Sequence, residues 1–319
     1  MQQMILDVDT GIDDALALLV AVRHPAVNLR AVTCVAGNAS LEQVVRNTLT
    51  VLDAAGAEDI PVAAGASRPL LADANHAAHV HGADGLGDLG LPKSARTIVP
   101  LHAVELLRRE ILASPTPVTL VPLAPMTNIA LLVRMYPEVL ANIERIVFMG
   151  GSASVGNATA VAEFNTWHDP EAAEIVLTSG VPITMYGLDV FYSVTIAPVD
   201  ISRLVAASEP GTNLAGRLLR HIVSVKGSEV RVAGDGHGDI GDAGAVCAAI
   251  DPDGLSTVNL PVRVSLGDPL TRGQTVVDRR TAGHEQKGAG DSRFRPIDVA
   301  LGVDSARYAT LFLDTITRR

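Results

Sequence analysis

Four aspartates lie close together near the start of the chain, in an otherwise apolar segment. Residues 7–19 read DVDTGIDDALALL, so Asp7, Asp9, Asp13 and Asp14 stand between an apolar run and a helical run. Carboxylates a few ångströms apart raise each other's pKa unless a cation lies between them. A helix N-cap uses one side-chain oxygen, so capping explains one aspartate and not three. Clustered oxygen ligands are typical of Ca²⁺ or Mg²⁺ sites.

A second set of polar residues lies farther along the chain, at predicted strand ends or helix starts. Asn38 follows VAG, three polar residues (Asn157, Glu163 and Asn165) stand in GNATAVAEFN, and Asp242 belongs to GDAGAV. Each one alone is an ordinary turn or cap residue. Together at one sheet edge they would supply the converging donors and acceptors that a polyol such as a sugar requires.

The elements that must position these residues follow an alternating pattern. Short runs rich in Val and Ile, at 4–8, 29–35, 60–63, 118–121, 145–149 and 183–186, predict strands. Helical spacing occurs between them at 13–23, 41–55, 102–113, 126–135 and 170–177. This order predicts an α/β fold, with a largely parallel, Rossmann-like open sheet and helices on both faces. Ligands of such sheets bind beyond the carboxyl ends of the strands, where the aspartates fall.

The second half of the chain is less regular. We predict a helix over 214–225, short strands through 277, and a final strand and helix after Pro296. Residues 278–295 are interpreted as a solvated turn of mixed charge with no function. Residues 72–92, rich in Gly, His and Asp, and residues 224–241 are candidate mobile segments over the site. We expect a single domain over residues 1–319.

Composition limits the classes of function. The chain has 48% hydrophobic and 19% charged residues, which predicts a globular protein with a large core. There is no apolar run of about 18 residues and no cleavable leader, so we expect a cytoplasmic protein without membrane contact. A net charge of −10 without a basic stripe argues against nucleic acid and favours small ligands. Cys34 and Cys247 lie in apolar contexts and are expected to be buried thiols.

Four motifs together resemble a known family. DVDTGIDDALALL, VAGNASLEQVVRN, APMTNIA, and VGNATAVAEFN followed by DPEAA are similar in order and spacing to the nucleoside hydrolases. These are calcium-dependent N-ribohydrolases often described as inosine–uridine-preferring. The resemblance runs from the N-terminus to about residue 250. It implies the nucleoside hydrolase fold, hydrolysis of ribonucleosides to ribose and free base, and a homodimer or homotetramer.

The resemblance also implies roles for individual residues. Four positions would bind Ca²⁺: Asp9, Asp14, Asp242 and the main-chain carbonyl of Leu123. Five side chains would bind the ribose: Asp13, Asn38, Asn157, Glu163 and Asn165. Asp9 would in addition be the general base towards a calcium-bound water, whose pKa the cation lowers.

The group that helps the base to leave is less clear from the sequence. Many relatives carry a His immediately before the last calcium aspartate, where this chain has Gly241. His81, in HVHGADGL, matches a His that some pyrimidine-preferring relatives place near the base, and is our candidate for base binding and for the leaving-group role. If the acid is limiting, Gly241→His is expected to raise activity on inosine. The sequence leaves the base preference open.

Three alternatives remain at this level. DVDTG superficially resembles the start of haloacid-dehalogenase-type phosphotransferases, with Asp7 as the nucleophile, although Gly11 and the Asp13–Asp14 pair do not fit. A non-catalytic nucleoside or ribose-binding protein is the second alternative. The third keeps the enzyme class and changes the substrate to a modified nucleoside or another N-riboside.

Overall fold

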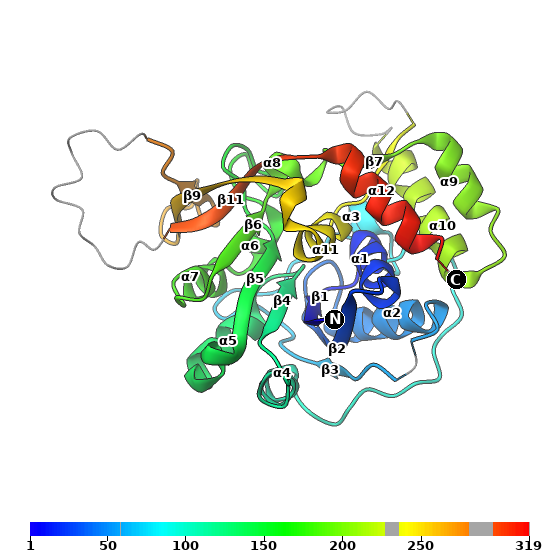
Figure 1. The fold of residues 1–319 in the computed structure, drawn as a ribbon. Coiled ribbons are helices and arrows are strands. Elements are labelled where there is room, and N and C mark those ends of the chain that lie inside the picture. Colours follow the sequence, from blue (N-terminus) through cyan, green and yellow to red (C-terminus); the bar gives the residue numbers. More distant parts are fainter. Residues whose placement is uncertain (58, 227–235, 281–295, 319) are drawn as a thin grey trace.

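The central sheet contains nine strands within the part of the chain that the structure, a computed structural model, describes: residues 1–57, 59–226, 236–280 and 296–318. These strands are β1 (Gln2–Val8), β2 (Val27–Cys34), β3 (Val62–Ala64), β4 (Val118–Pro122), β5 (Ile143–Met149), β6 (Ile183–Tyr186), β9 (Leu255–Val264), β10 (Thr275–Val277) and β11 (Pro296–Val303). Their order is β10-β9-β11-β6-β5-β4-β1-β2-β3 (Figure 1). Two further strands, β7 (Thr195–Ile196) and β8 (Gly238–Asp239), form a separate antiparallel pair.

The sheet is largely parallel, as predicted. β1 pairs in parallel with both β2 and β4, and the parallel pairing continues through β5 and β6 to β11. At the far edge β9 runs antiparallel to both β11 and β10. The sequence indicated short strands in this region but not their direction, because their pairing depends on contacts distant in sequence.

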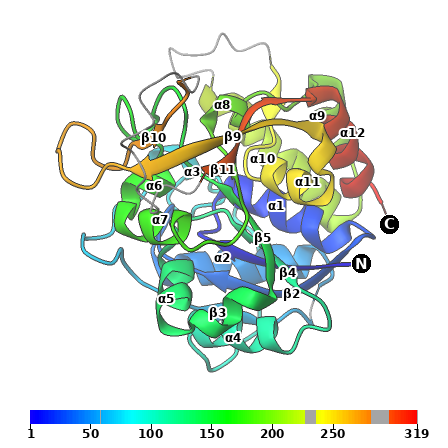
Figure 2. The same cartoon turned by 60° about the vertical axis from the view of Figure 1, so that its left-hand side comes forward.

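Helices cover both faces of the sheet. On one side lie α4 (Ala103–Leu112), α5 (Thr127–Met135) and α7 (Pro170–Leu177), and on the other α1 (Ile12–Arg23), α11 (Ala243–Ile250) and α12 (Ser305–Ile316), as Figure 1 and the turned view in Figure 2 show. The remaining helices are α2 (Leu41–Ala54), α3 (Ala78–His81), α6 (Phe164–His168), α8 (Leu188–Phe191), α9 (Pro198–Val205) and α10 (Pro210–Lys226), with 3₁₀ turns at Pro137–Asn142 and Pro252–Gly254.

The two faces bury two separate cores, and β1 contributes to both. Met4, Leu6 and Val8 pack into the core that includes α1 and α2, whereas Ile5 packs into the core that includes α4 and α5. This alternation follows from the two-residue period of a strand. Because β1 is buried on both faces it reads as a continuous apolar run, and the polar residues appear where the strand ends.

Three smaller predictions concerned the cysteines, membrane-spanning helices and mobile segments. Cys34 and Cys247 are both buried free thiols, as expected. None of the described helices is both long enough and apolar enough to cross a membrane. Residues 227–235, from the second candidate mobile segment, and residues 281–295, from the predicted charged turn, lie outside the described ranges. The mobility of 72–92 stays a prediction.

Candidate active site

A cavity of about 850 Å³ opens beyond the carboxyl ends of the central strands. Asn38 lines it from the segment after β2, Leu123 from the end of β4, and Met149 from the end of β5. The volume lies within the range of small-molecule sites. The prediction that ligands bind at this edge of the sheet therefore agrees with the position of the cavity.

Three carboxylates converge at the floor of this cavity. Oxygens of Asp13, Asp14 and Asp242 lie within 4.8 Å of one another. Asp14 is fixed by the turn before α1, because the amides of Gly11 and Asp9 donate to its two oxygens at 2.9 and 3.2 Å. Asp13 and Asp242 line the cavity itself. Two of the three predicted carboxylate ligands, Asp14 and Asp242, thus meet at one point, and the third member of this cluster is Asp13, which was predicted to bind ribose, rather than Asp9.

Asp9 lies beside Asp14 and is fully buried. Both of its oxygens are bound by Asn38, whose backbone N–H donates to Oδ2 at 2.7 Å and whose Nδ2 donates to Oδ1 at 3.1 Å. A Cβ on Gly37 would stand 2.0 Å from Asp9 Oδ2, so glycine is required there. Asn38 therefore orients Asp9 as well as lining the cavity, a contact that sequence reasoning did not anticipate.

Burial and mutual repulsion make this group of carboxylates costly to ionise. Burial, followed by the charge of Asp13, raises the pKa of Asp14 to about 7. Burial and then Asp14 raise the pKa of Asp9 well above its usual range, and burial and then Asp13 do the same for Asp242. Each carboxylate disfavours the charge of the next. A cation among them removes that penalty.

The donor set fits a hard divalent cation. Asp13 Oδ1 is buried without a hydrogen-bond partner, and the converging atoms are all carboxylate oxygens. Oxygen ligands in this arrangement suit Ca²⁺ or Mg²⁺ rather than a metal that prefers sulfur or imidazole. The acidic cluster is thus a candidate metal centre.

Glu163 and Asn165 form the wall next to the carboxylates. Glu163 caps α6 by accepting from the amides of Asn165 and Thr166, and it also accepts from the amide of Gly151 at 2.9 Å. Burial raises the pKa of the Glu163 carboxyl, and these amides oppose the shift. Asn165 Nδ2 donates to the carbonyl of Leu123 at 3.0 Å. This hydrogen bond places the Leu123 carbonyl, a predicted metal ligand, at the cavity.

Asn157 lies at the rim of the same cavity. Its side chain is exposed, and Oδ1 accepts from the amide of Phe164 at 2.9 Å. All five predicted ribose residues line the cavity together with Leu123 and Asp242, whereas Asp9 and Asp14 lie beneath them. The roles of these residues as ligands or as base stay predictions that their positions allow.

His81 is held against the start of α1. It is 8% exposed, and its Nδ1 accepts from the backbone N–H of Ile12 at 3.2 Å and lies 3.9 Å from Asp13 Oδ1. A neutral imidazole that accepts at Nδ1 carries its proton on Nε2. The ring therefore lines the cavity as a potential proton donor, next to the proposed ribose residue Asp13.

Sequence reasoning missed part of the cavity wall. The missed lining residues are Phe164, Phe191, Tyr192, His221 and Ile222, whereas Asn75 and His76 belong to the 72–92 segment that was expected to lie over the site. Nothing in their local pattern distinguishes them from ordinary loop or helix residues, because tertiary contacts bring them to the site. Trp167 lines the cavity as well, and its ring centroid lies 6.1 Å from that of Phe164.

The geometry at residue 241 argues against the expected gain from Gly241→His. Gly241 has φ +50°, and a Cβ there would lie 2.6 Å from Asp13 Cβ and 3.1 Å from Phe191 Cζ. A side chain at this position strains the backbone and displaces Asp13. We now expect Gly241→His and Gly241→Ala both to lower kcat/KM, by at least tenfold if Asp13 moves by about 1 Å. Steady-state kinetics of the two variants checks this, and a gain with His alone would contradict it.

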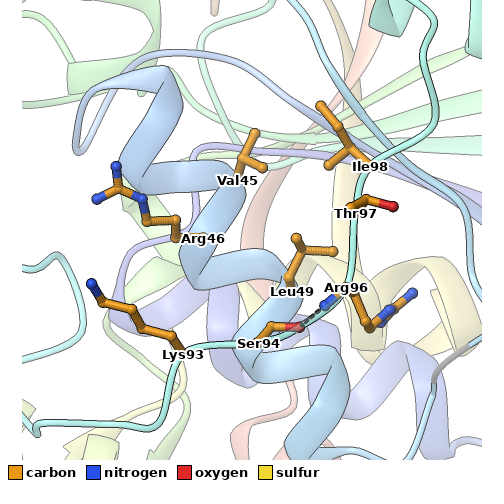
Figure 3. Close-up of a pocket in the computed structure, with 8 residues that line it drawn as sticks. All are labelled: Val45, Arg46, Leu49, Lys93, Ser94, Arg96, Thr97 and Ile98. Carbon is orange, nitrogen blue, oxygen red and sulfur yellow. Dashed lines mark hydrogen bonds between the residues drawn. The ribbon is translucent and has the colours of Figure 1, made fainter.

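A second cavity, of about 400 Å³, lies between α2 and residues 93–98 (Figure 3). Val45, Leu49 and Ile98 give it an apolar part, and the lining residues within the described ranges include no carboxylate. Of its basic side chains, Arg46 pairs with Glu42, and Arg96 donates to backbone carbonyls. This cavity lacks the groups for the chemistry expected from the aspartates.

Comparison with known proteins decides the family. The family model described as "Inosine-uridine preferring nucleoside hydrolase" matches residues 4–310. The chain belongs to the nucleoside hydrolase family. An inosine-uridine preferring nucleoside hydrolase from Leishmania major is 40% identical over 281 residues, or 88% of each chain. The pyrimidine-specific ribonucleoside hydrolase RihA of Shewanella sp. (strain MR-7) is 38% identical over 98% of this chain and 95% of its own.

Solved structures agree with the sequence match. The purine-preferring ribonucleoside hydrolase from Gardnerella vaginalis superimposes with a TM-score of 0.89 at 30% identity, covering 99% of this chain and 98% of that one. As a nucleoside hydrolase, the chain is an enzyme that hydrolyses ribonucleosides to ribose and free base. The family match excludes the phosphotransferase alternative.

Proposed function

We propose that the chain hydrolyses the N-glycosidic bond of ribonucleosides with Ca²⁺ bound at the carboxylate cluster. Asp9, Asp14, Asp242 and the carbonyl of Leu123 hold the ion, and Asp13 binds a ribose hydroxyl. The observation that carries the proposal is the convergence of Asp13, Asp14 and Asp242 within 4.8 Å at the cavity floor. The raised pKa values of Asp14 and Asp242 in the absence of positive charge support a cation there.

The ribose lies against the polar wall. Glu163 and Asn165 bind backbone groups, and the Asn38 amide donates to Asp9 and Asp14, so their polar groups are fixed before the sugar arrives. Fixed donors and acceptors reduce the ordering cost of binding. Asn157, at the rim, binds the 5′ side, where the cavity opens.

The chemistry follows from the charges of the site. Cleavage of the glycosidic bond develops oxocarbenium character at C1′, and neighbouring carboxylates stabilise this positive charge more than they stabilise the neutral substrate. When bound, Ca²⁺ lowers the pKa of a water molecule. Asp9, whose carboxylate is oriented by Asn38, would serve as the base for the water that attacks C1′. His81 donates from Nε2 to the departing base.

The names of the relatives suggest the base. One relative is described as inosine-uridine preferring and another as pyrimidine-specific, and uridine satisfies both descriptions. The apolar residues Phe191 and Ile222 form the part of the wall that suits a base. We therefore propose uridine among the substrates, with a modified nucleoside or another N-riboside as the alternative.

The test is ribose release, measured with a reducing-sugar assay. The substrates are inosine, adenosine, guanosine, uridine, cytidine and their 2′-deoxy forms, each with and without prior chelation. The proposal expects release from uridine that is lost without the 2′-hydroxyl and after chelation. Ribose release that survives chelation would reject the calcium site. The absence of ribose release from all the natural ribonucleosides would favour the modified-substrate alternative.

The charge of the wall also predicts which nucleosides are excluded. Asp13, Glu163, Asp239 and Asp242 line the cavity, and the described lining residues include neither Lys nor Arg. A 5′-phosphate adds about −2 charge, which these carboxylates repel. Uridine 5′-monophosphate is therefore expected to have a kcat/KM at least 100-fold below that of uridine. Equal values in parallel assays, with phosphatase contamination excluded, would contradict this.

Oligomerisation is proposed from family resemblance. We propose a homodimer or homotetramer, and light scattering coupled to size-exclusion chromatography tests it. A mass of about 33.3 kDa, that of one chain, at micromolar concentration would reject the proposal.

A further inference from the structure

Asn128 is a fully buried polar residue in the APMTN motif, at the start of α5. Its amide Nδ2 donates to Asp7 Oδ1 at 2.8 Å and to the carbonyl of Cys34 at 3.0 Å. Its Oδ1 accepts from the backbone N–H of Ala66 at 2.9 Å. Asp7 lies in β1, Cys34 ends β2, and Ala66 follows β3. One side chain thus connects the carboxyl ends of three adjacent strands.

Asp7 joins this connection to the proposed metal site. Its side-chain Oδ1 also accepts from Thr33 Oγ1 at 2.6 Å, and its backbone carbonyl accepts from the N–H of Leu123 at 2.8 Å. Asp7 stands two residues before Asp9. Asp7 and Asn128 therefore fix the position of the Asp9 backbone relative to that of Leu123, and Asp9 and the Leu123 carbonyl are two of the proposed calcium ligands.

Gly65 leaves room for the Asn128 amide. A Cβ at Gly65 would lie 2.1 Å from Asn128 Oδ1 and 2.5 Å from Nδ2. The space around Asn128 is thus shaped to this side chain. The Asn128 amide is paired through both its nitrogen and its oxygen, which favours one arrangement of this side chain, although Asp7 Oδ2 is buried without a partner.

We propose that Asn128 is a positioning residue that sets the distance between Asp9 and the Leu123 carbonyl and so determines calcium affinity. This inference rests on the proposed calcium site. Asn128 is absent from the cavity lining, so it acts through Asp7 and the strand ends. Changes to groups that orient metal ligands typically weaken metal binding by about 10–100-fold.

The informative variant is Asn128→Asp, which keeps the shape and the acceptor for Ala66 but removes both N–H donors. Calcium affinity of the chelator-stripped full chain is measured by isothermal titration calorimetry, and uridine turnover is followed against calcium concentration. We expect a Kd about tenfold or more above that of the parent, with kcat largely recovered at saturating calcium. Gly65→Ala, which displaces the amide from the other side, is expected to weaken binding in the same way.

A matched control separates positioning from general stability. Ile111, near the end of α4, is fully buried in the core and belongs neither to the proposed ligands nor to the cavity lining. Ile111→Ala is expected to lower the Tm while the calcium Kd stays within about twofold of the parent. If Asn128→Asp and Gly65→Ala lower the Tm but bind calcium like Ile111→Ala, the inference is wrong. If the parent itself binds no calcium, the proposed metal site fails first, which the same titration shows.

Discussion

Asp9→Asn is expected to lower kcat by about 10²- to 10⁴-fold while the chain stays folded, because the change removes the proposed general base. The amide keeps the size of the carboxylate but cannot take a proton from water. The Asn38 backbone N–H, which donates to Asp9 Oδ2 at 2.7 Å, can still donate to an amide oxygen placed there. Ribose release from uridine at saturating calcium measures the effect.

The same variant has an expected effect on stability. Burial and the neighbouring Asp14 raise the pKa of Asp9, so ionisation of this carboxyl destabilises the metal-free fold. Removing its charge relieves this repulsion. The Tm of Asp9→Asn in chelator is therefore expected to equal or exceed that of the parent, which separates lost chemistry from lost structure.

Asp314→Asn is the matched control for this substitution. Asp314 is an exposed carboxylate on α12, and its neutralisation is expected to leave both kcat and Tm close to the parent values. Parent-like turnover by Asp9→Asn, with calcium present, would reject Asp9 as the base. The remaining candidates at the cavity floor would then be Asp13 and Asp242.

The sequence predicted the central elements well because their signals are local. The predicted strand at 183–186 coincides with β6, and the predicted helix at 170–177 coincides with α7. Both have strong apolar patterns bounded by turn residues or a proline. The β7–β8 pair and the short helices α6 and α8 were not predicted, because two- to five-residue elements form through tertiary contacts and carry little periodic signal.

The candidate site divides in the same way. The aspartates and the asparagines after the strands were predictable, since polar residues that end buried strands stand out in sequence. The pairing of Asn38 with Asp9, the steric block at Gly241 and the contribution of α10 to the wall were not. Each depends on contacts between loops that are distant in the sequence, and local patterns in a single sequence do not predict such contacts.

Buried carboxylates make the metal-free protein sensitive to pH. The pKa of Asp7 is raised to about 7 by burial, and that of Asp14 also to about 7, against an ordinary value of 3.8. Between about pH 4 and pH 7 the folded chain therefore binds more protons than the unfolded chain. The free energy of unfolding falls as pH rises through this window. For Asp7 alone, the full change corresponds to about 4 kcal/mol.

Calcium is expected to reverse this dependence, because carboxylate ligands bind the ion when deprotonated. At pH 8 the ion neutralises charges that otherwise repel, whereas at pH 5 protons compete with it. Calcium at about 100 times its Kd adds about 2.7 kcal/mol to the free energy of unfolding. Scanning calorimetry with calcium or chelator is thus expected to show a larger Tm difference at pH 8 than at pH 5.

Chelation at pH 8 should also abolish uridine hydrolysis, since the proposed nucleophile depends on the ion. Restoring calcium returns both the Tm and the activity if the fold survives stripping. Magnesium provides the comparison, because it demands a smaller and more regular coordination than converging carboxylates and a carbonyl provide. Equal Tm differences at the two pH values would mean that the carboxylate cluster at Asp14 and Asp242 is not a calcium site, and equal recovery with magnesium would mean that the site does not select calcium over magnesium.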